Sequence, residues 1–222
     1  MRRILLPALF LLIATVSFAQ TPKPVPDSLK YALKKFEPGR VTFNDGRVVQ
    51  GEFNYSYLDQ VIRFKENGKV MALSDNAYVS KLSAGGKLFT RYKSGFIETV
   101  DFIGAVSLCV LKEVSVIKEE LAGAYGFTDQ ASFNKEVNMR NMDARVQDMV
   151  QTYDLEQELV LPYKYSETYY LMNGNRVFPA TAQSFKKVFS SEKSKVEQYL
   201  QEHNVDFSSF SDVSAFFTFM KK

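Results

Sequence analysis

The chain has 222 residues, a formal net charge of +3, 45% hydrophobic residues, and 19 phenylalanines beside 12 tyrosines. This length allows one large domain or two small ones, with enough apolar side chains to fill a core. The nearly balanced charge argues against a protein that neutralises nucleic-acid phosphates, and a single cysteine excludes an internal disulfide.

Residues 1–19 have the pattern of a secretory signal peptide. Two arginines precede an apolar run at 4–16, and small residues at Ser17 and Ala19 favour cleavage between Ala19 and Gln20. The run is shorter than the roughly 20 apolar residues of a membrane-spanning helix, and no later stretch is long enough either. Removing the leader takes basic residues from 28 to 26 against 25 acidic ones, so the mature charge is near +1. We expect an exported protein that is periplasmic, outer-membrane-associated or secreted.

Residues 20–38 are expected to form a proline-rich spacer followed by a short helix. Three prolines in "TPKPVP" favour a stiff, extended segment. The next stretch, 27–36, has apolar residues spaced i, i+3, i+4 and i+7, which predicts an amphipathic helix. Asp27 is a candidate cap for this helix, and Pro38-Gly39 is expected to end it.

Residues 39–127 have the pattern of an antiparallel β region. Short runs alternate apolar and polar residues, and glycine-containing turns separate them. The strongest turn signals are Asn44-Asp45-Gly46, Asn67-Gly68 and Gly85-Gly86. Because each run is short and each turn contains glycine, the pattern predicts a meander that curls into a small barrel or a sandwich.

The stretch "FIGAVSLCVL", residues 102–111, is almost continuously apolar. It predicts a central strand buried on both faces, and a helix from Val106 to Leu121 is the competing interpretation. Cys109 lies within this stretch, where a buried and chemically inert thiol is expected.

The rest of the chain combines a weakly patterned segment with a clear C-terminal unit. Residues 128–152 lack a sustained apolar period and are expected to be a loop or a weak helix. Residues 153–222 contain a hairpin signal at Asn173-Gly174 and then three amphipathic segments, the last capped by Ser211. The predicted fold class is therefore α+β: an antiparallel meander with a C-terminal hairpin and short helices packed on it.

The C-terminal pattern also resembles a known group of proteins. The Asn173-Gly174 hairpin, "FKKVF", a helix rich in Lys and Glu, "NVDF" and a last amphipathic helix are similar to the end of uncharacterised secreted or envelope proteins of Bacteroidota. The leader ending "FAQ" and the upstream "DGRVVQGEF" fit the same group. The resemblance implies an exported protein without an assigned activity, and it transfers no functional residues.

Few residues are suited to catalysis or to metal binding. His203 is the only histidine and is expected at a helix end, so it has no visible partner to orient it as a base. One His and one Cys do not make any usual zinc site, and we expect no metal and no cofactor. Ser184 and Lys187 have the spacing of a serine–lysine nucleophile, but on a helix this spacing also arises by chance, and Ser184 is a candidate cap.

Two classes of function follow. The first is a non-enzymatic envelope protein that binds another protein or a glycan, because its many tyrosines suit recognition surfaces. The weak candidate residues for this binding are Tyr163, Tyr165, Tyr169 and Tyr170. The alternative is a carboxylate-dependent hydrolase acting on a glycan or a cell-envelope substrate. Its candidate acids are Asp154, Glu156 and Glu158. For Glu156 and Glu158 a solvated strand face is the favoured interpretation, because no neighbouring residue in the sequence is suited to raise one pKa, so no catalytic residue is assigned.

Overall fold

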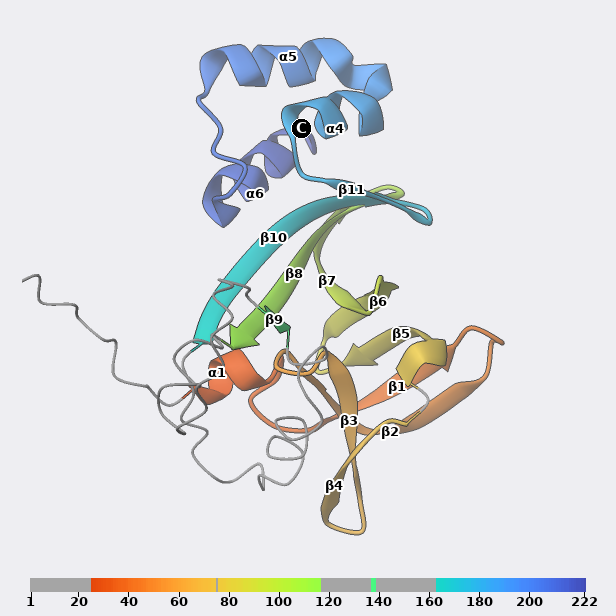
Figure 1. The fold of residues 1–222 in the computed structure, drawn as a ribbon. Helices are drawn as coiled ribbons and strands as arrows, with labels where there is room; N and C mark the ends of the chain where they lie inside the picture. The colour runs from red at the N-terminus through yellow and green to blue at the C-terminus, as the bar shows by residue number, and fades with distance from the viewer. Residues whose placement is uncertain (1–24, 75, 117–136, 139–162) are drawn as a thin grey trace, which may run out of the picture.

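The computed structural model describes residues 25–74, 76–116, 137–138 and 163–222 (Figure 1). The strands are β1 (Glu37–Phe43), β2 (Val48–Ser56), β3 (Val61–Glu66), β4 (Lys69–Ala72), β5 (Val79–Ala84), β6 (Lys87–Tyr92), β7 (Gly95–Ile103), β8 (Val106–Val116), β9 (Val137–Asn138), β10 (Tyr163–Asn173) and β11 (Arg176–Pro179). The helices are α1 (Asp27–Lys30), α4 (Ala182–Val188), α5 (Lys193–Glu202) and α6 (Phe210–Phe219), with 3-10 turns η1 (Asn76–Tyr78) and η3 (Ser190–Glu192).

The strands form one antiparallel sheet in the order β11-β10-β8-β7-β6-β5-β1-β2-β3-β4, and β9 pairs with β8 off this path. Two meanders make up most of the sheet, one from β5 to β8 and one from β1 to β4, and the pairing of β1 with β5 joins them. No strand pair closes this sheet among the described residues. Short helices accompany it, which confirms the predicted α+β class.

The predicted hairpins are confirmed. The three turn signals of the β region connect β1 to β2, β3 to β4, and β5 to β6, and Asn173-Gly174 connects β10 to β11. At the tip of the second hairpin, Asn67 has a φ of 51° and Gly68 a φ of 77°. Two consecutive positive φ values are the geometry that a two-residue turn needs to match the twist of its strands.

The predicted helix over residues 27–36 is wrong beyond its first turn, because α1 ends at Lys30. After this point the chain runs beside β2. The Asn54 side chain accepts a hydrogen bond from the Leu33 amide at 3.0 Å and donates one to the Leu33 carbonyl at 2.9 Å. The Tyr57 amide donates to the Lys30 carbonyl at 2.8 Å. These long-range bonds take up backbone groups that the helix would have paired internally.

The predicted end of that helix, Pro38-Gly39, lies inside β1. Gly39 serves strand packing there, since a Cβ added to it would lie 2.3 Å from the Ser83 carbonyl oxygen of the neighbouring strand β5. The close approach of the two backbones therefore requires glycine.

The apolar stretch 102–111 belongs to two strands, so the single predicted strand is wrong at its start. β7 ends at Ile103, Gly104 turns the chain with a φ of 55°, and β8 begins at Val106. The apolar residues around this turn differ in burial, because Phe102 is 68% exposed whereas Val106 is buried. Residues 106–116 are a strand, which rules out the competing helix for this part, and Leu108 to Leu111 are buried on both faces as expected.

Two apolar cores use the same face of the long strands β8 and β10, because Val106 and Val110 of one core and Val114 of the other lie an even number of residues apart on β8. The β core fills the curl of the sheet and consists of Val25, Val41, Phe43, Phe53, Tyr55, Tyr57, Leu58, Ile62, Val79, Leu82, Ala84, Phe89, Phe96 and Val114. The helix core lies under α4, α5 and α6 and consists of Val106, Leu108, Val110, Tyr169, Leu171, Ala180, Phe185, Phe189, Val196, Tyr199, Val213, Phe216, Phe217 and Met220. Both strands twist along their length, so one face serves both cores.

The three C-terminal helices are confirmed, but their caps differ from the prediction. Thr181 caps α4 by accepting from the Ser184 amide at 3.2 Å, so Ser184 lies inside the helix. Ser209 rather than Ser211 caps α6, and its hydroxyl accepts from the Asp212 amide. Both caps lie three residues before the amide they satisfy, which is the usual geometry.

None of the helices in the described ranges is long and apolar enough to cross a bilayer. The leader 1–19, all but two residues of the 128–152 segment, and the acids Asp154, Glu156 and Glu158 lie outside the described residues.

Candidate functional site

A polar row separates the two cores on the shared face of β8 and β10. Residues two apart on a strand face the same way, so Tyr165, Glu167 and Tyr169 share this face on β10. In the register of the two strands, Lys112 lies directly opposite Glu167. The next strand, β7, contributes Glu98 from its inner face. Charged side chains therefore meet where an uninterrupted apolar face would be expected.

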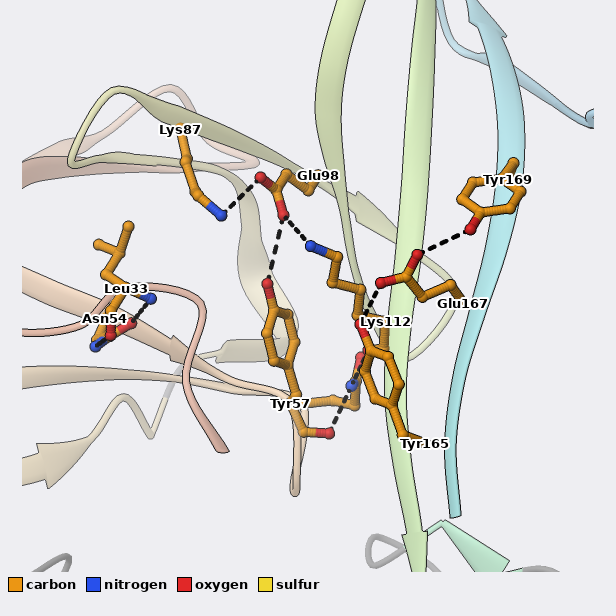
Figure 2. A network of polar contacts seen from close by, with 10 residues as sticks. Leu33, Asn54, Tyr57, Lys87, Glu98, Lys112, Tyr165, Glu167 and Tyr169 are labelled. Carbon is orange, nitrogen blue, oxygen red and sulfur yellow. Dashed lines mark hydrogen bonds and ion pairs between the residues drawn. The ribbon is translucent and has the colours of Figure 1, made fainter. Parts of the chain in front are cut away.

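Glu98 is the centre of this cluster (Figure 2). It is 7% exposed, and its two carboxylate oxygens have different partners. Oε1 lies 2.9 Å from the Lys87 ammonium, and Oε2 lies 3.5 Å from the Lys112 ammonium. The Tyr57 hydroxyl donates a hydrogen bond to Oε2 at 3.4 Å. A buried carboxylate is costly unless it is paired and hydrogen-bonded, and these three donors meet that requirement.

Glu167 is held by two phenols of its own strand (Figure 2). The hydroxyls of Tyr165 and Tyr169 each donate to one carboxylate oxygen, the second across 2.8 Å. Their spacing of two residues on each side of Glu167 places all three side chains on one face. We refer to Tyr57, Lys87, Glu98, Lys112, Tyr165, Glu167 and Tyr169 as the Glu98 cluster.

The phenols of this cluster are held in their protonated form. Burial raises the pKa of Tyr57 well above its usual range, and the nearby Glu98 carboxylate raises this pKa further. Burial and the hydrogen bond to Glu167 raise the pKa of Tyr165, and the same two causes raise the pKa of Tyr169 to about 12. These tyrosines therefore act as hydrogen-bond donors near neutral pH.

Gln60 fixes the connection after β2 against β8, which keeps the cluster in place. Its side-chain oxygen accepts from the Tyr55 hydroxyl at 2.5 Å. Its amide nitrogen donates to the Tyr57 carbonyl at 3.0 Å and to the Lys112 carbonyl at 3.1 Å. The Val114 amide also donates to the Tyr57 carbonyl at 3.4 Å. The connection that follows β2 is thereby hydrogen-bonded to β8, which is not a neighbour of β2 in the sheet.

The four tyrosines proposed from the sequence do not form one surface. Tyr163, Tyr165 and Tyr169 lie on the inner face, whereas Tyr170 lies on the opposite face with its ring 5.0 Å from that of Tyr92. The rings of Tyr169 and Tyr170 are buried, and those of Tyr163 and Tyr165 are half-buried. The structure brings together Tyr165 and Tyr169, through Glu167.

Cys109 and His203, the only thiol and the only imidazole in the sequence, lie apart from each other and from the Glu98 cluster. Cys109 is fully buried on the opposite face of β8, as expected, and burial raises the pKa of its thiol to about 11. His203 follows α5 and is exposed, and its ring stacks on that of Tyr199 at 4.1 Å.

The serine–lysine spacing does not produce a nucleophile. The Ser184 hydroxyl is buried beside the Thr181 hydroxyl, which donates to it at 3.0 Å. The Lys187 ammonium instead lies 4.8 Å from the centre of the Phe178 ring. Ser184 therefore contributes to the hydrogen bonds at the start of α4, and Lys187 packs on Phe178 instead of contacting Ser184.

The sequence prediction missed the residues at the centre of the Glu98 cluster. Their signal is a charge at an inward position of an otherwise apolar strand. Glu98 lies two residues after Phe96, which faces the β core, and Lys112 lies between Val110 and Val114, which face inward. Strict alternation would have placed both charges inside.

Among the described residues, no group of three or more His, Cys, Asp or Glu side chains is placed to hold a metal ion. No family model, no curated protein and no solved structure matches this chain.

Proposed function

We propose that this chain is an exported, non-enzymatic protein of the cell envelope that works by binding another protein or a glycan. The leader pattern of residues 1–19 supports export. One observation carries the proposed absence of catalysis. Within the described residues, the two acids of the Glu98 cluster are already held by donors, Glu98 by three groups and Glu167 by two.

This arrangement suits stability better than turnover. A catalytic carboxylate pair needs one acid that is protonated and one that is free to attack or to accept a proton. Glu98 faces two ammonium groups and one phenol, which occupy the lone pairs of its carboxylate. The usual alternative nucleophiles and bases, Cys109, Ser184 and His203, lie in three separate environments.

The rim of the cluster offers groups that suit recognition. The side chains of Lys87 and Lys112 are 33% and 23% exposed, so water and ligands reach them from one side. Tyr163 and Tyr165 lie half-buried on the same face and pack against the β core. Rings combined with a few charged groups are common in binding surfaces for proteins and for small ligands.

The test is crosslinking of the full-length protein in envelope fractions, followed by mass spectrometry, together with a glycan array. The variant Tyr163→Ser is compared with Tyr78→Ser, which removes a ring that is 65% exposed in η1. We expect one partner or glycan that the wild type and the Tyr78→Ser variant capture and that Tyr163→Ser loses. Equal capture by all three proteins, or none, would contradict binding through this face.

The hydrolase alternative has its own decisive result. Its acids Asp154, Glu156 and Glu158 lie outside the described residues, so it is tested by activity. Turnover of an envelope glycan or peptide by the purified protein, abolished in Glu156→Gln or Glu98→Gln with the fold retained, would replace the binding proposal.

A further inference from the structure

A shallow pocket of about 300 Å³ lies where the β10–β11 hairpin meets α4. Asn173, Arg176, Phe178, Lys187 and Val188 line it. In the register of the hairpin, Arg176 lies opposite Asn173. In Figure 1 the helix lies above this end of the sheet, away from the curl that holds the β core.

Two of the five lining side chains are cations that have no carboxylate partner among the residues that the structure describes. Among the described residues, neither Arg176 nor Lys187 forms an ion pair, and Lys187 instead lies over the Phe178 ring. The neighbouring lysines behave differently. Lys186 pairs with Glu197 at 3.2 Å, and Lys195 pairs with an acid at 3.1 Å. The pocket therefore carries two positive charges that the described part of the chain leaves uncompensated.

The remaining lining groups complete a recognisable binding chemistry. The Asn173 amide offers both a donor and an acceptor, and Phe178 and Val188 give an apolar wall. A guanidinium presents paired donors that match a carboxylate or a phosphate, and an ammonium adds a point charge. A concave site with an apolar wall and a few convergent polar groups is the usual form of a small-molecule site, and 300 Å³ is at the small end of that range.

We propose that this pocket binds a small organic anion. Its carboxylate or phosphate contacts Arg176 and Lys187, and its sugar-sized body lies against Phe178 and Val188. The proposal is independent of the Glu98 cluster, which shares no residue with this pocket.

Ordinary structural roles explain Arg176 and Lys187 separately, but they do not explain why both cations line the same pocket. A lysine in the last turn of a helix complements the helix dipole, and Lys187 is in that turn of α4. Arg176 at a hairpin end is solvated. Neither role requires both cations to line one hollow beside an amide and a ring, where like charges disfavour each other.

The test is calorimetric titration of the full chain at low salt with four probes: glucuronate, glucose 6-phosphate, inorganic phosphate and neutral glucose. The first two distinguish a carboxylate from a phosphate source. We expect glucuronate or glucose 6-phosphate to bind more tightly than inorganic phosphate, which lacks the body, and glucose to bind at least about tenfold more weakly, because it makes no charge-assisted hydrogen bonds. Affinity should fall as salt rises.

Variants then locate the site. Arg176→Gln and Lys187→Gln should each weaken binding about tenfold or more, since each loses one charge-assisted contact. Lys193→Gln is the matched control, because it removes an exposed lysine at the start of α5 that does not line the pocket. Three results would overturn the proposal. They are glucose binding as tight as that of the two organic anions, a loss of affinity in Lys193→Gln equal to that in the two pocket variants, and no binding of either organic anion.

Discussion

The Tyr57 hydroxyl donates a hydrogen bond to the Glu98 carboxylate across 3.4 Å, and this contact joins the residue that follows β2 to β7 through the interior of the curled sheet. The two residues are 41 positions apart, and four strand pairings separate their strands along the sheet. The two lysines on Glu98 come from β6 and β8, so the contacts of Glu98 join three adjacent strands to the residue that follows β2. These contacts connect distant strands of the open sheet across its interior, as the pairing of the first and last strands does in a closed barrel.

Glu98→Gln is expected to destabilise the protein by about 1–3 kcal/mol, because it removes both ion pairs and leaves two ammonium groups facing an uncharged amide. This loss is smaller than for a fully buried ion pair, because both lysine side chains are partly exposed to solvent. The measurement is the urea unfolding midpoint. Glu197→Gln breaks a pair in which both side chains are about 40% exposed, and its expected loss is about 0–1 kcal/mol. Equal losses would contradict a special role for Glu98.

Stability should fall as the pH rises from about 10 to 12. Phenols of the unfolded chain lose their protons near pH 10, whereas burial raises the pKa of Tyr169 and of Tyr170 to about 12 and moves the pKa of Tyr57 upward. Above pH 10 the unfolded chain therefore binds fewer protons than the folded chain, and the free energy of unfolding decreases with pH.

Urea unfolding at several pH values between 9 and 12 measures this slope. Lysines also titrate in this window, so the comparison between variants isolates the phenol. Tyr57→Phe should flatten the slope relative to the wild type, and Tyr78→Phe, which removes an exposed hydroxyl, should leave it unchanged. A Tyr57→Phe slope identical to that of the wild type would show that this phenol titrates alike in both states.

Gly39 and Gly51 face each other across β1 and β2, yet alanine should have different effects at the two positions. At Gly39 the new Cβ would lie 2.3 Å from the Ser83 carbonyl oxygen and 2.7 Å from the Ala84 Cβ, so β1 must move away from β5. We expect Gly39→Ala to cost about 1–3 kcal/mol of unfolding free energy, as overpacking does. At Gly51 the nearest atom is a ring carbon of Phe53 at 3.3 Å, which can shift.

Gly51→Ala should therefore stay within about 1 kcal/mol of the wild type, helped by the entropy that alanine saves in the unfolded chain. Thermal unfolding of the two variants measured side by side gives the comparison. A larger loss at Gly51 than at Gly39 would contradict the described packing of β1 on β5.

Phe216→Ala should destabilise the protein by about 3–5 kcal/mol, as expected for a fully buried ring. Phe216 is 0% exposed and stacks on Phe185 with ring centres 4.1 Å apart and on Tyr199 at 4.5 Å. Phe210 on the same helix is 44% exposed, so Phe210→Ala should cost about 1 kcal/mol. Similar unfolding midpoints for the two variants would show that α6 does not anchor the helix core.

Local signals predicted the hairpins and the C-terminal helices well. Asn-Gly and Gly-Gly turns specify their backbone within two residues, so Gly68, Gly86 and Gly174 all lie in the expected connections. The same local reasoning gave a wrong prediction for the stretch after α1. Its apolar spacing is helical, but the Leu33 amide bonds to the Asn54 side chain, 21 residues away, instead of to a helix carbonyl. The spacing of apolar residues within a segment cannot predict a hydrogen bond to a residue so far away in the sequence.

By itself, the sequence determined the alternation, the turns, the amphipathic helices and the leader pattern, because each depends on residues within about ten positions of one another. The tertiary structure alone decided which strands are neighbours, that one face of β8 and β10 serves two cores, and that Lys87, Glu98 and Lys112 meet between them. The reason is physical: burial of a charge becomes tolerable only where partners from distant strands converge, and that convergence is a property of the folded sheet.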